Sequence, residues 1–335
     1  MKTYEHRQFG LEFLVQAERR EPQPAANQVA VKFRAAALNY RDLAFAKGKY
    51  NANANLPAVP LSDGAGEVIA LGVGVTRWKI GDRVSPIFRQ GWIEGPISAE
   101  KASTALGGGQ LEGVLKECGV FHEQGLVRIP EYLSYEEAAT LPCAAVTAWN
   151  ALVCVGKLKA GDTVLTLGTG GVSVFAIQFA KMHGVRVIAT SSSDEKLDRV
   201  RQLGATDTIN YKRMPNWDQE VLRLTNGEGV DHVVEVGGAG TLPKSVGSVR
   251  VDGVISLIGF LSGGGDLDLV PVIRKAIHLQ GIPVGSRRMF EDMNHAIGMN
   301  HLKPVIDKTF AFADARQALE YMGTGSHFGK IVIKF

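Results

Sequence analysis

The chain has 335 residues, 45% of them hydrophobic, and its formal charge is only +3 because 37 basic residues are offset by 34 acidic ones. This length and apolar content favour about two globular domains, and the lack of a basic block argues against nucleic-acid or anionic-lipid binding. No apolar run approaches the roughly 18 residues that a membrane-spanning helix needs. Residues 1–7 contain no apolar segment and the three cysteines form no CxxC pair, so we expect a cytoplasmic protein without a secretory signal.

The first 122 residues favour a small β domain. Strand-like runs alternate with turns that contain glycine or proline; the clearest runs lie at residues 29–33, 66–70 and 82–87. One short helix is predicted over residues 40–47 and is ended by Gly48. The glycine-rich stretch 91–113 is predicted to be a surface loop.

Helices and strands alternate in the centre of the chain. Ser134 and Glu137 have the spacing of a capping box at the start of a helix, and a second helix is predicted over residues 143–153. The strands predicted after it lie at residues 164–168, 185–190, 207–211, 230–236, 253–259 and 278–284. Such alternation predicts an α/β fold with a doubly wound parallel sheet of the Rossmann type. The tail adds a helix over residues 313–322 and a strand over residues 330–335.

The first turn of this alternating region carries closely spaced glycines. A branched apolar strand ends at Gly168 and a helical pattern opens directly after it, with Ser173 at the place of the usual third glycine. Glycines at such a turn let the backbone approach a pyrophosphate, which then lies on the N–H groups of the helix start. The residues predicted to bind a dinucleotide there are Gly168, Thr169, Gly170, Gly171 and Val172. The alternative is a glycine-rich loop without a cofactor.

The end of the second strand of this unit bears on which dinucleotide binds. NAD-binding proteins usually place an acidic residue about 20 residues past the first glycine, whereas this chain has Ser191 there. A carboxylate would repel a 2′-phosphate, while the hydroxyls of Ser191 and Ser192 and the ammonium of Lys196 can donate to it. We therefore favour NADP(H) over NAD(H). Alternatively, the serines only cap the following helix.

The chain resembles the medium-chain dehydrogenase/reductase superfamily over essentially its full length. The segments that carry the resemblance are residues 141–149, 168–173, 189–197, 203–205, 209–211 and 327–330. They are similar to the zinc-independent quinone-oxidoreductase-like branch, whose members are often labelled zinc-type alcohol dehydrogenase-like. The resemblance implies a GroES-like β-barrel catalytic domain, residues 1–122 and 287–335, and a Rossmann domain, residues 123–286.

The positions of the zinc ligands in this superfamily carry other residues here. Asn39 stands where zinc members have cysteine, Ser62 and Asp63 stand where they have His-Glu, and only Cys143 matches in kind. A catalytic zinc needs about three protein ligands of cysteine, histidine or carboxylate type. We therefore expect no metal, and we interpret Cys143 as a small packed residue near the cofactor rather than a nucleophile.

The resemblance also implies further cofactor contacts. Ser192, Lys196 and Tyr211 are expected at the 2′-phosphate. The remaining expected contacts are Asn39 and Thr147 at the nicotinamide, backbone groups of Ile258, Gly259 and Phe260 at the same end, Gly237 on the adenosine side and Lys330 at the phosphates. Tyr211 could alternatively be only the exposed end of a strand, and Lys330 could be only a solvated charge on the surface.

These residues predict an NADPH-dependent oxidoreductase that works without a metal. A quinone or an α,β-unsaturated carbonyl suits such an enzyme, because conjugation spreads the charge that hydride addition leaves behind. The protein would supply orientation and hydrogen-bond donors to the developing oxyanion. Asn39, a tyrosine (Tyr40 or Tyr50) and Thr147 beside the nicotinamide are the candidate catalytic residues.

Other functions and the assembly state stay open. A metal-free alcohol or aldehyde dehydrogenase with a tyrosine donor is one alternative, and a non-catalytic NADPH-binding structural or sensor protein is another. An RNA-binding side role is disfavoured by the unclustered charge. The strand at residues 278–284 is expected at the edge of the sheet, where it could pair with a second copy, so we predict a homodimer.

Overall fold

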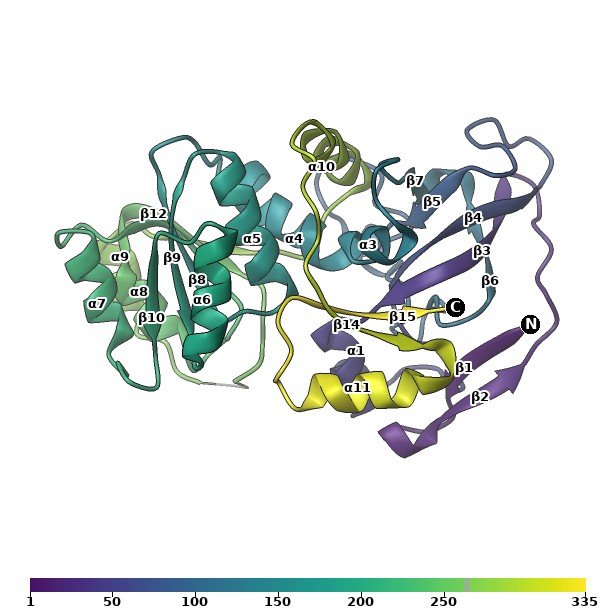
Figure 1. The fold of residues 1–335 in the computed structure, drawn as a ribbon, viewed down its shortest axis with the longest axis horizontal. Helices are drawn as coiled ribbons and strands as arrows, with labels where there is room; N and C mark the ends of the chain where they lie inside the picture. Colours follow the sequence, from purple (N-terminus) through teal and green to yellow (C-terminus); the bar gives the residue numbers. More distant parts are fainter. Residues whose placement is uncertain (263–264) are drawn as a thin grey trace. The chain divides into compact units, whose positions relative to one another are not determined.

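The computed structural model describes residues 1–262 and 265–335, and the chain divides into two compact units (Figure 1). The first unit comprises residues 1–146 and 285–335, and the second comprises residues 147–284. The N-terminal part and the tail therefore form one unit, and the central part forms the other. Residues 123–146, which the sequence analysis assigned to the central domain, belong to the first unit.

A seven-stranded sheet is the framework of the first unit. Its strand order is β14 (Ile306–Ala311), β15 (Lys330–Lys334), β3 (Gln28–Ala37), β4 (Asp63–Leu71), β5 (Arg83–Pro86) and β7 (Leu126–Arg128), with β6 (Cys118–His122) paired to β3. β14 and β15 are parallel and the other pairs are antiparallel. β1 (Lys2–His6) and β2 (Leu14–Glu18) form a separate antiparallel pair. The alternate inward side chains of β3 and β4 build a core with fully buried Val29, Val31 and Val68.

Short helices flank this sheet; they are α1 (Tyr40–Ala46), α2 (Ala99–Ala102), α3 (Tyr135–Ala139), α10 (Arg287–Met299) and α11 (Ala315–Gly323). The predicted capping box of α3 is confirmed. Ser134 Oγ accepts from the Glu137 N–H at 3.1 Å, and the Glu137 carboxylate accepts from the Ser134 N–H at 2.8 Å. The predicted helix over residues 40–47 is also present as α1, which packs against α11 (Figure 1).

The prediction of a surface loop over residues 91–113 is wrong for Trp92, residues 106–108 and Gly113, which are buried. Their glycines allow a close approach to neighbouring backbone. A Cβ at Gly107 would lie 2.5 Å from the Leu61 carbonyl oxygen, and one at Gly113 would lie 2.1 Å from the Pro60 carbonyl oxygen. The glycines therefore mark tight packing of the backbone here rather than exposure.

The described part of the second unit contains a six-stranded sheet in which every pair is parallel. Its order is β10 (Asp207–Asn210), β9 (Arg186–Ser191), β8 (Thr163–Leu167), β11 (Val230–Glu235), β12 (Val249–Leu257) and β13 (His278–Gly281). The predicted doubly wound parallel sheet is confirmed, and β13 lies at its edge as expected. The helix before β12, Leu242–Ser248, ends where Val249 pairs with Val230 and begins that strand.

Helices cover both faces of this sheet. α5 (Gly171–Met182) and α6 (Asp194–Leu203) pack together, and α7 (Trp217–Leu224), α8 (Leu242–Ser248) and α9 (Leu269–Arg274) form a second packed group (Figure 1). The strand order reverses at β8, between β9 and β11. Ligands of open α/β sheets bind at the carboxyl ends of the strands around such a reversal, so a ligand is expected at the turn after β8.

A helical stretch over residues 141–155 connects α3 to this sheet. It includes two segments of π-helix, Leu141–Ala145 and Asn150–Val155, on either side of α4 (Val146–Trp149). Among the described residues, no helix is both long enough and apolar enough to cross a membrane.

Candidate functional site

The turn between β8 and α5 holds the glycines that are predicted to bind a pyrophosphate. Gly168 adopts a φ of 70°, which favours glycine, and Gly170 is the N-cap of α5. Gly170 itself has an extended backbone, and a Cβ placed on it would meet no other atom within 4 Å. Neither backbone strain nor internal packing therefore requires glycine at position 170. The glycine leaves the backbone at the start of α5 open to close approach, as a phosphate-binding turn needs.

The structure explains the serine that replaces the third glycine of this turn. Ser173 is buried, and its hydroxyl donates to the Leu167 carbonyl oxygen at 2.7 Å. This bond ties the first turn of α5 to the end of β8, so a small polar residue keeps the helix against the strand. Around it, Thr169 is buried, while Gly171 and Val172 are half-buried.

The serines after β9 divide into a helix cap and its neighbours. Ser193 is the N-cap of α6, since its Oγ accepts from the Lys196 N–H at 3.3 Å. Ser191 is buried, and its carbonyl oxygen accepts from the Tyr211 N–H at 3.0 Å. The structure thus brings Ser191, Tyr211 and the first turn of α6, with Lys196, to the same end of β9 and β10. Ser192 is half-buried between the strand and the cap.

A further cation lies at this end of the sheet and was not singled out from the sequence. Arg213 forms an ion pair with Asp194, whose carboxylate also accepts from the Asn210 side chain at 2.6 Å. The Asp194 charge is therefore compensated, and the arginine adds a donor next to Lys196 and Tyr211. The signal was present in the sequence, since Arg213 follows Tyr211 by two residues.

A buried carboxylate organises the loop after β11. Glu235 is fully buried, and one of its oxygens accepts from the N–H groups of Gly237 (2.7 Å) and Gly238 (3.0 Å) and from the Thr241 hydroxyl (2.6 Å). The Ser245 hydroxyl donates to its other oxygen. These bonds hold the loop, and they occupy the N–H of Gly237, a residue that is expected on the adenosine side of the cofactor. Sequence reasoning did not single out Glu235.

The backbone after β12 is held in the same way. The N–H groups of Ile258 and Gly259 both donate to the Glu235 carbonyl oxygen, at 2.9 and 3.2 Å. What Ile258 and Gly259 can still offer to a nicotinamide is therefore their carbonyl oxygens. A Cβ at Gly259 would lie 1.7 Å from the Val236 carbonyl oxygen, so packing alone explains this glycine. The Phe260 side chain is exposed.

The first unit holds a buried polar cluster where three neighbouring strands meet. Lys330 begins β15, Asp63 begins β4, and Leu38 and Asn39 follow β3, which lies between them. The Lys330 ammonium, 2% exposed, donates to the Leu38 carbonyl oxygen and to Asn39 Oδ1, both at 2.6 Å. It also lies 3.9 Å from Asp63 Oδ2. The ammonium therefore has an acceptor or counter-ion for each of its three hydrogens.

The resemblance implied that Lys330 contacts the cofactor phosphates, and the alternative was a solvated charge on the surface. The observed placement of Lys330 matches neither expectation. The side chain is buried, and its donors are already used within the first unit. Lys330 consequently belongs with Asn39 and Asp63 as part of one network. Residues 291 positions apart in the chain meet here because β15 and β4 both pair with β3.

Asp63 completes the cluster. Its carboxylate accepts from the Ser62 hydroxyl at 2.6 Å and from the Cys143 N–H at 3.0 Å. Burial raises the pKa of Asp63, whereas the Lys330 ammonium and the Ser62 hydrogen bond oppose that rise. Burial also raises the pKa of the half-buried Cys143 thiol, with Asp63 adding to the effect, so the thiol stays protonated near neutral pH.

These residues do not fit a catalytic zinc. An amide and a hydroxyl replace zinc-type ligands at Asn39 and Ser62, and the Lys330 ammonium already supplies the positive charge next to Asp63. Throughout residues 1–262 and 265–335, no group of three histidine, cysteine, aspartate or glutamate side chains is arranged to hold a metal ion. No step of the chemistry is therefore assigned to a metal.

Asn39 is fixed at both its main chain and its side chain. Its N–H donates to Asp42 Oδ2 at 2.8 Å, which is half of a capping box at the start of α1. Its Oδ1 accepts a hydrogen bond from Lys330, so the side-chain amide cannot change its orientation without losing that bond. The Asn39 Nδ2 is buried and makes no hydrogen bond of good geometry with the described residues, although the Asn39 side chain lies close enough to the Asp63 carboxylate to lower the pKa of that carboxyl. An oriented amide donor of this kind suits an oxyanion site.

The two candidate tyrosines lie in different surroundings. The Arg41 guanidinium stacks 4.5 Å from the centre of the Tyr50 ring, which links Tyr50 to the cluster through α1. Tyr40 is 45% exposed at the start of that helix. Thr147 is buried in α4, at the beginning of the second unit.

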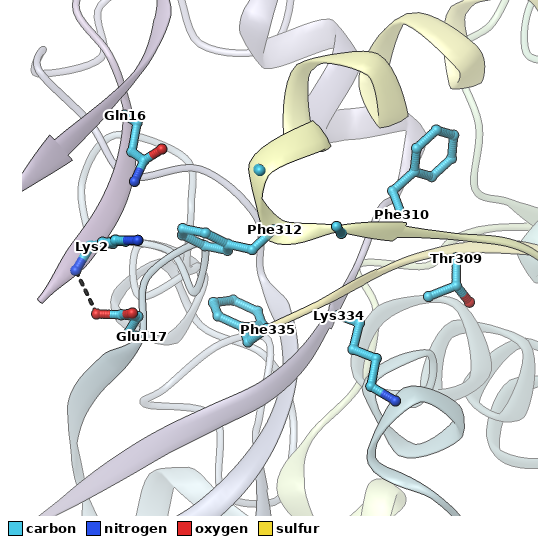
Figure 2. A pocket seen from close by; sticks show the side chains of 10 residues that line it. Lys2, Gln16, Glu117, Thr309, Phe310, Phe312, Lys334 and Phe335 are labelled. Atoms are coloured by element: carbon cyan, nitrogen blue, oxygen red, sulfur yellow. Dashed lines mark hydrogen bonds between the residues drawn. The ribbon is translucent and has the colours of Figure 1, made fainter.

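A separate groove on the first unit has a different character (Figure 2). Phe310, Phe312 and Phe335 line it, with Lys2 and Lys334 at its margins. Lys334 is four residues along β15 from Lys330, or roughly 13 Å at the usual rise of a strand, and it pairs with Glu136 at 2.7 Å. The groove thus lies at the other end of β15 and contains none of the predicted site residues.

Comparison with known proteins supports both units. The family model described as alcohol dehydrogenase GroES-like domain matches residues 25–131, and the one described as zinc-binding dehydrogenase matches residues 171–298. A zinc-type alcohol dehydrogenase-like protein of Schizosaccharomyces pombe is 45% identical over 92% of this chain and 90% of its own length. A quinone oxidoreductase of Pseudomonas aeruginosa is 31% identical over 92% of this chain and 91% of its own length. The crystal structure of a candidate alcohol dehydrogenase from Sinorhizobium meliloti is 40% identical and superposes with a TM-score of 0.93, covering 100% of this chain and 98% of that one.

Proposed function

Because the chain belongs to the medium-chain dehydrogenase/reductase superfamily and is thereby an oxidoreductase, we propose that it reduces a quinone or an α,β-unsaturated carbonyl with NADPH and without a metal. The observation that carries this proposal is the buried Lys330–Asn39–Asp63 network. In it the Lys330 ammonium contacts Asn39 and Asp63, two residues that by resemblance stand at zinc-site positions of the superfamily. The similarity to a quinone oxidoreductase supports the same class of substrate.

The choice of NADPH rests on the end of β9. The second unit belongs to a dinucleotide-binding family, which implies NAD(P). Ser191 replaces the acid that would repel a 2′-phosphate, and Lys196, Tyr211 and Arg213 lie at the same end of the sheet. Since Asn210 and Arg213 compensate the Asp194 charge, that carboxylate opposes a phosphate only weakly.

The chemistry assigns separate tasks to the residues of the first unit. The cofactor supplies a hydride, and the carbonyl oxygen of the substrate gains negative charge as it is received. Asn39 Nδ2 donates a hydrogen bond to that oxygen, and Lys330 holds the amide in the orientation that exposes this donor to it. Tyr50 is the second candidate donor, and solvent returns the proton.

A metal-free alcohol dehydrogenase is the second candidate function. The name of the Schizosaccharomyces pombe relative favours it, and Tyr50 beside Arg41 would then polarise the alcohol oxygen. A direct comparison separates the two functions. The enzyme is given NADPH with 1,2-naphthoquinone or with but-3-en-2-one, and NADP⁺ with ethanol or benzyl alcohol. Turnover of the first pair and none of the alcohols supports the reductase; the reverse result supports the dehydrogenase.

We also propose that two copies pair through β13. This strand is the edge of the sheet, and the neighbouring α9 presents three exposed apolar side chains, Leu269 (59%), Val270 (48%) and Ile273 (75%). An exposed strand edge beside an apolar helix face favours association. Light scattering at micromolar concentration should give twice the mass of the chain. A monomer mass for wild type would contradict the pairing, and Ile273→Asp should shift a dimer toward monomer.

A further inference from the structure

We propose that Glu235 is a positioning residue for the nicotinamide end of the cofactor. Its side chain holds the loop after β11, residues 236–241, and its main chain holds the loop after β12, residues 258–262. Glu235 and these two loops form the Glu235 clamp, all of which lies in the second unit. The inference rests on the proposed function only in that the bound dinucleotide must transfer a hydride.

The first observation is that Glu235 uses its side chain and its main chain at the same time. Its carboxylate accepts hydrogen bonds from four groups that follow β11: the N–H groups of Gly237 and Gly238 and the hydroxyls of Thr241 and Ser245. Its main-chain carbonyl oxygen accepts from the N–H groups of Ile258 and Gly259. Because Glu235 is the last residue of β11, a single residue of the sheet fixes the backbone of both loops.

The second observation is that the two loops are also bonded to each other. The Ser262 hydroxyl donates to the Gly237 carbonyl oxygen at 2.8 Å and accepts from the Gly240 N–H at 2.7 Å. The Ser262 N–H donates to the same Gly237 oxygen at 2.9 Å. A Cβ at Gly238 would lie 3.1 Å from the Phe260 Cα, so the two backbones run close together there. A shift of the loop after β11 must therefore move the loop after β12.

The third observation is the direction in which this bonding turns a backbone acceptor. The peptide between Ile258 and Gly259 is trans, so its N–H and its C=O lie on opposite sides. Since the Gly259 N–H donates to the Glu235 carbonyl oxygen, the Ile258 carbonyl oxygen points away from Glu235. By resemblance, Ile258 and Gly259 are expected at the nicotinamide, whose carboxamide NH₂ group needs an acceptor. An acceptor held in one direction fixes the orientation of the ring, on which hydride transfer depends steeply.

A buried carboxylate suits this task because it can accept several hydrogen bonds at once. Glu235 is fully buried, so an apolar side chain there would leave the N–H groups of Gly237 and Gly238 and the Thr241 hydroxyl without their acceptor. A glutamine would preserve most of the arrangement. Its oxygen can accept from those three donors, and its NH₂ group can donate to the Ser245 hydroxyl oxygen.

Two threonines allow a matched comparison. Thr241→Val removes the hydroxyl that donates to Glu235 at 2.6 Å. Thr225→Val is the control, because the buried Thr225 hydroxyl donates to the Val221 carbonyl oxygen at 2.8 Å and accepts from the Gly229 N–H at 3.0 Å. These bonds hold the segment that leads into β11 at its other end. Both variants delete one loop hydroxyl and keep the shape of the side chain, but only Thr241→Val alters the Glu235 clamp.

The test is a single turnover followed by stopped-flow absorbance, with NADPH, excess enzyme and saturating 1,2-naphthoquinone. The rate constant reports hydride transfer in the bound complex, whereas the amplitude reports the fraction of folded enzyme. Thr241→Val should lower the rate constant roughly tenfold, the effect of a lost hydrogen bond to a charged group, and Thr225→Val should keep the wild-type rate constant. Equal rate constants in all three proteins, with or without a loss of amplitude, would reduce the clamp to a structural element and overturn the proposal.

Glu235 itself is tested by Glu235→Gln and Glu235→Met. The glutamine variant should keep the wild-type rate constant, and the methionine variant should lose at least as much as Thr241→Val. Equal losses in both would overturn the hydrogen-bonded clamp. If circular dichroism shows that Glu235→Met does not fold, Ser262→Ala decides, since Ser262 is exposed and its hydroxyl bonds the two loops together. A wild-type rate constant in Ser262→Ala would then count against the clamp.

Failure of the proposed function can be told apart by binding alone. The dissociation constant of NADPH is measured by fluorescence and needs no turnover. If wild type reduces neither quinone nor enone, yet Thr241→Val binds NADPH roughly tenfold more weakly and Thr225→Val does not, the reductase function fails and the clamp stands. If wild type reduces nothing and all three proteins bind NADPH alike or not at all, both proposals fail.

Discussion

Replacing Lys330 by methionine is the most severe test of the buried network, because it removes the ammonium and leaves the Asp63 carboxylate in place. Asp63 would remain fully buried without its counter-ion, while keeping its bonds from Ser62 and the Cys143 N–H. Breaking one partner of a buried ion pair typically costs about 3–5 kcal/mol. We expect a loss of that size in the unfolding free energy at pH 7. The double variant Lys330→Met/Asp63→Asn should lose less, because no uncompensated charge remains.

The loss of stability in Lys330→Met should depend on pH in a defined direction. Burial already raises the pKa of Asp63, and removing Lys330 takes away the main opposing interaction, so that pKa rises further. A carboxyl whose folded pKa exceeds its unfolded pKa binds protons on folding, so acid stabilises the folded state relative to the unfolded one. The penalty of Lys330→Met should therefore shrink between pH 8 and pH 5, and in the double variant it should not.

Urea unfolding at pH 8, 7 and 5 measures these penalties, and hydrogen exchange of the β15 amides assigns them to the first unit. Lys334→Met is the matched control, since that lysine ends the same strand at the surface and pairs with the half-buried Glu136. Exposed or partly exposed pairs contribute about 0–1 kcal/mol. A double variant as unstable as the single one, or a Lys330→Met penalty independent of pH, would refute the assignment of the loss to an uncompensated Asp63.

Three other changes probe different parts of the chain. Ser191→Asp puts a carboxylate at the end of β9, which should weaken NADPH binding about 10- to 100-fold and leave NADH little changed; equal effects on both cofactors in fluorescence titrations would remove Ser191 from the 2′-phosphate site. Ser173→Ala removes the bond to the Leu167 carbonyl oxygen and should cost about 1 kcal/mol in urea unfolding, whereas no loss would show that this bond does not hold α5 to β8. Burial lowers the pKa of His232 from 6.5 to about 4, so this neutral histidine contributes stability above pH 6.5 that is lost as the pH falls toward 4, by up to about 3 kcal/mol. His232→Gln should flatten that part of the stability profile, and an unchanged slope would assign the acid sensitivity to other groups.

The sequence analysis predicted those elements that depend on interactions between residues close together in the chain. The glycine turn after residue 167, the capping box at Ser134 and the alternation of strands and helices each depend on residues close together in the chain, and the structure contains all three. The replacement of the zinc ligands could also be recognised residue by residue, since it needed only the identities at positions 39, 62 and 143.

The features that the sequence analysis missed depend on strand order. Lys330 reaches Asn39 only because β15 and β4 flank β3, and no local pattern carries that information. One signal was available: Lys330 opens a strand of consecutive apolar residues, where an exposed lysine is unexpected. Arg41 gave no such signal, because its burial depends on the loop at residues 106–108 closing over it.

The most direct test of the central claim is steady-state NADPH oxidation with 1,2-naphthoquinone, measured after dialysis against EDTA. The account predicts that wild type keeps its full rate after dialysis. It also predicts that Asn39→Ala loses about 10²- to 10³-fold in kcat, as for removal of one oxyanion donor, while the exposed control Asn53→Ala is unaffected. Loss of activity in EDTA that zinc restores, or a wild-type kcat in Asn39→Ala, would contradict a metal-free reductase that relies on the Asn39 amide.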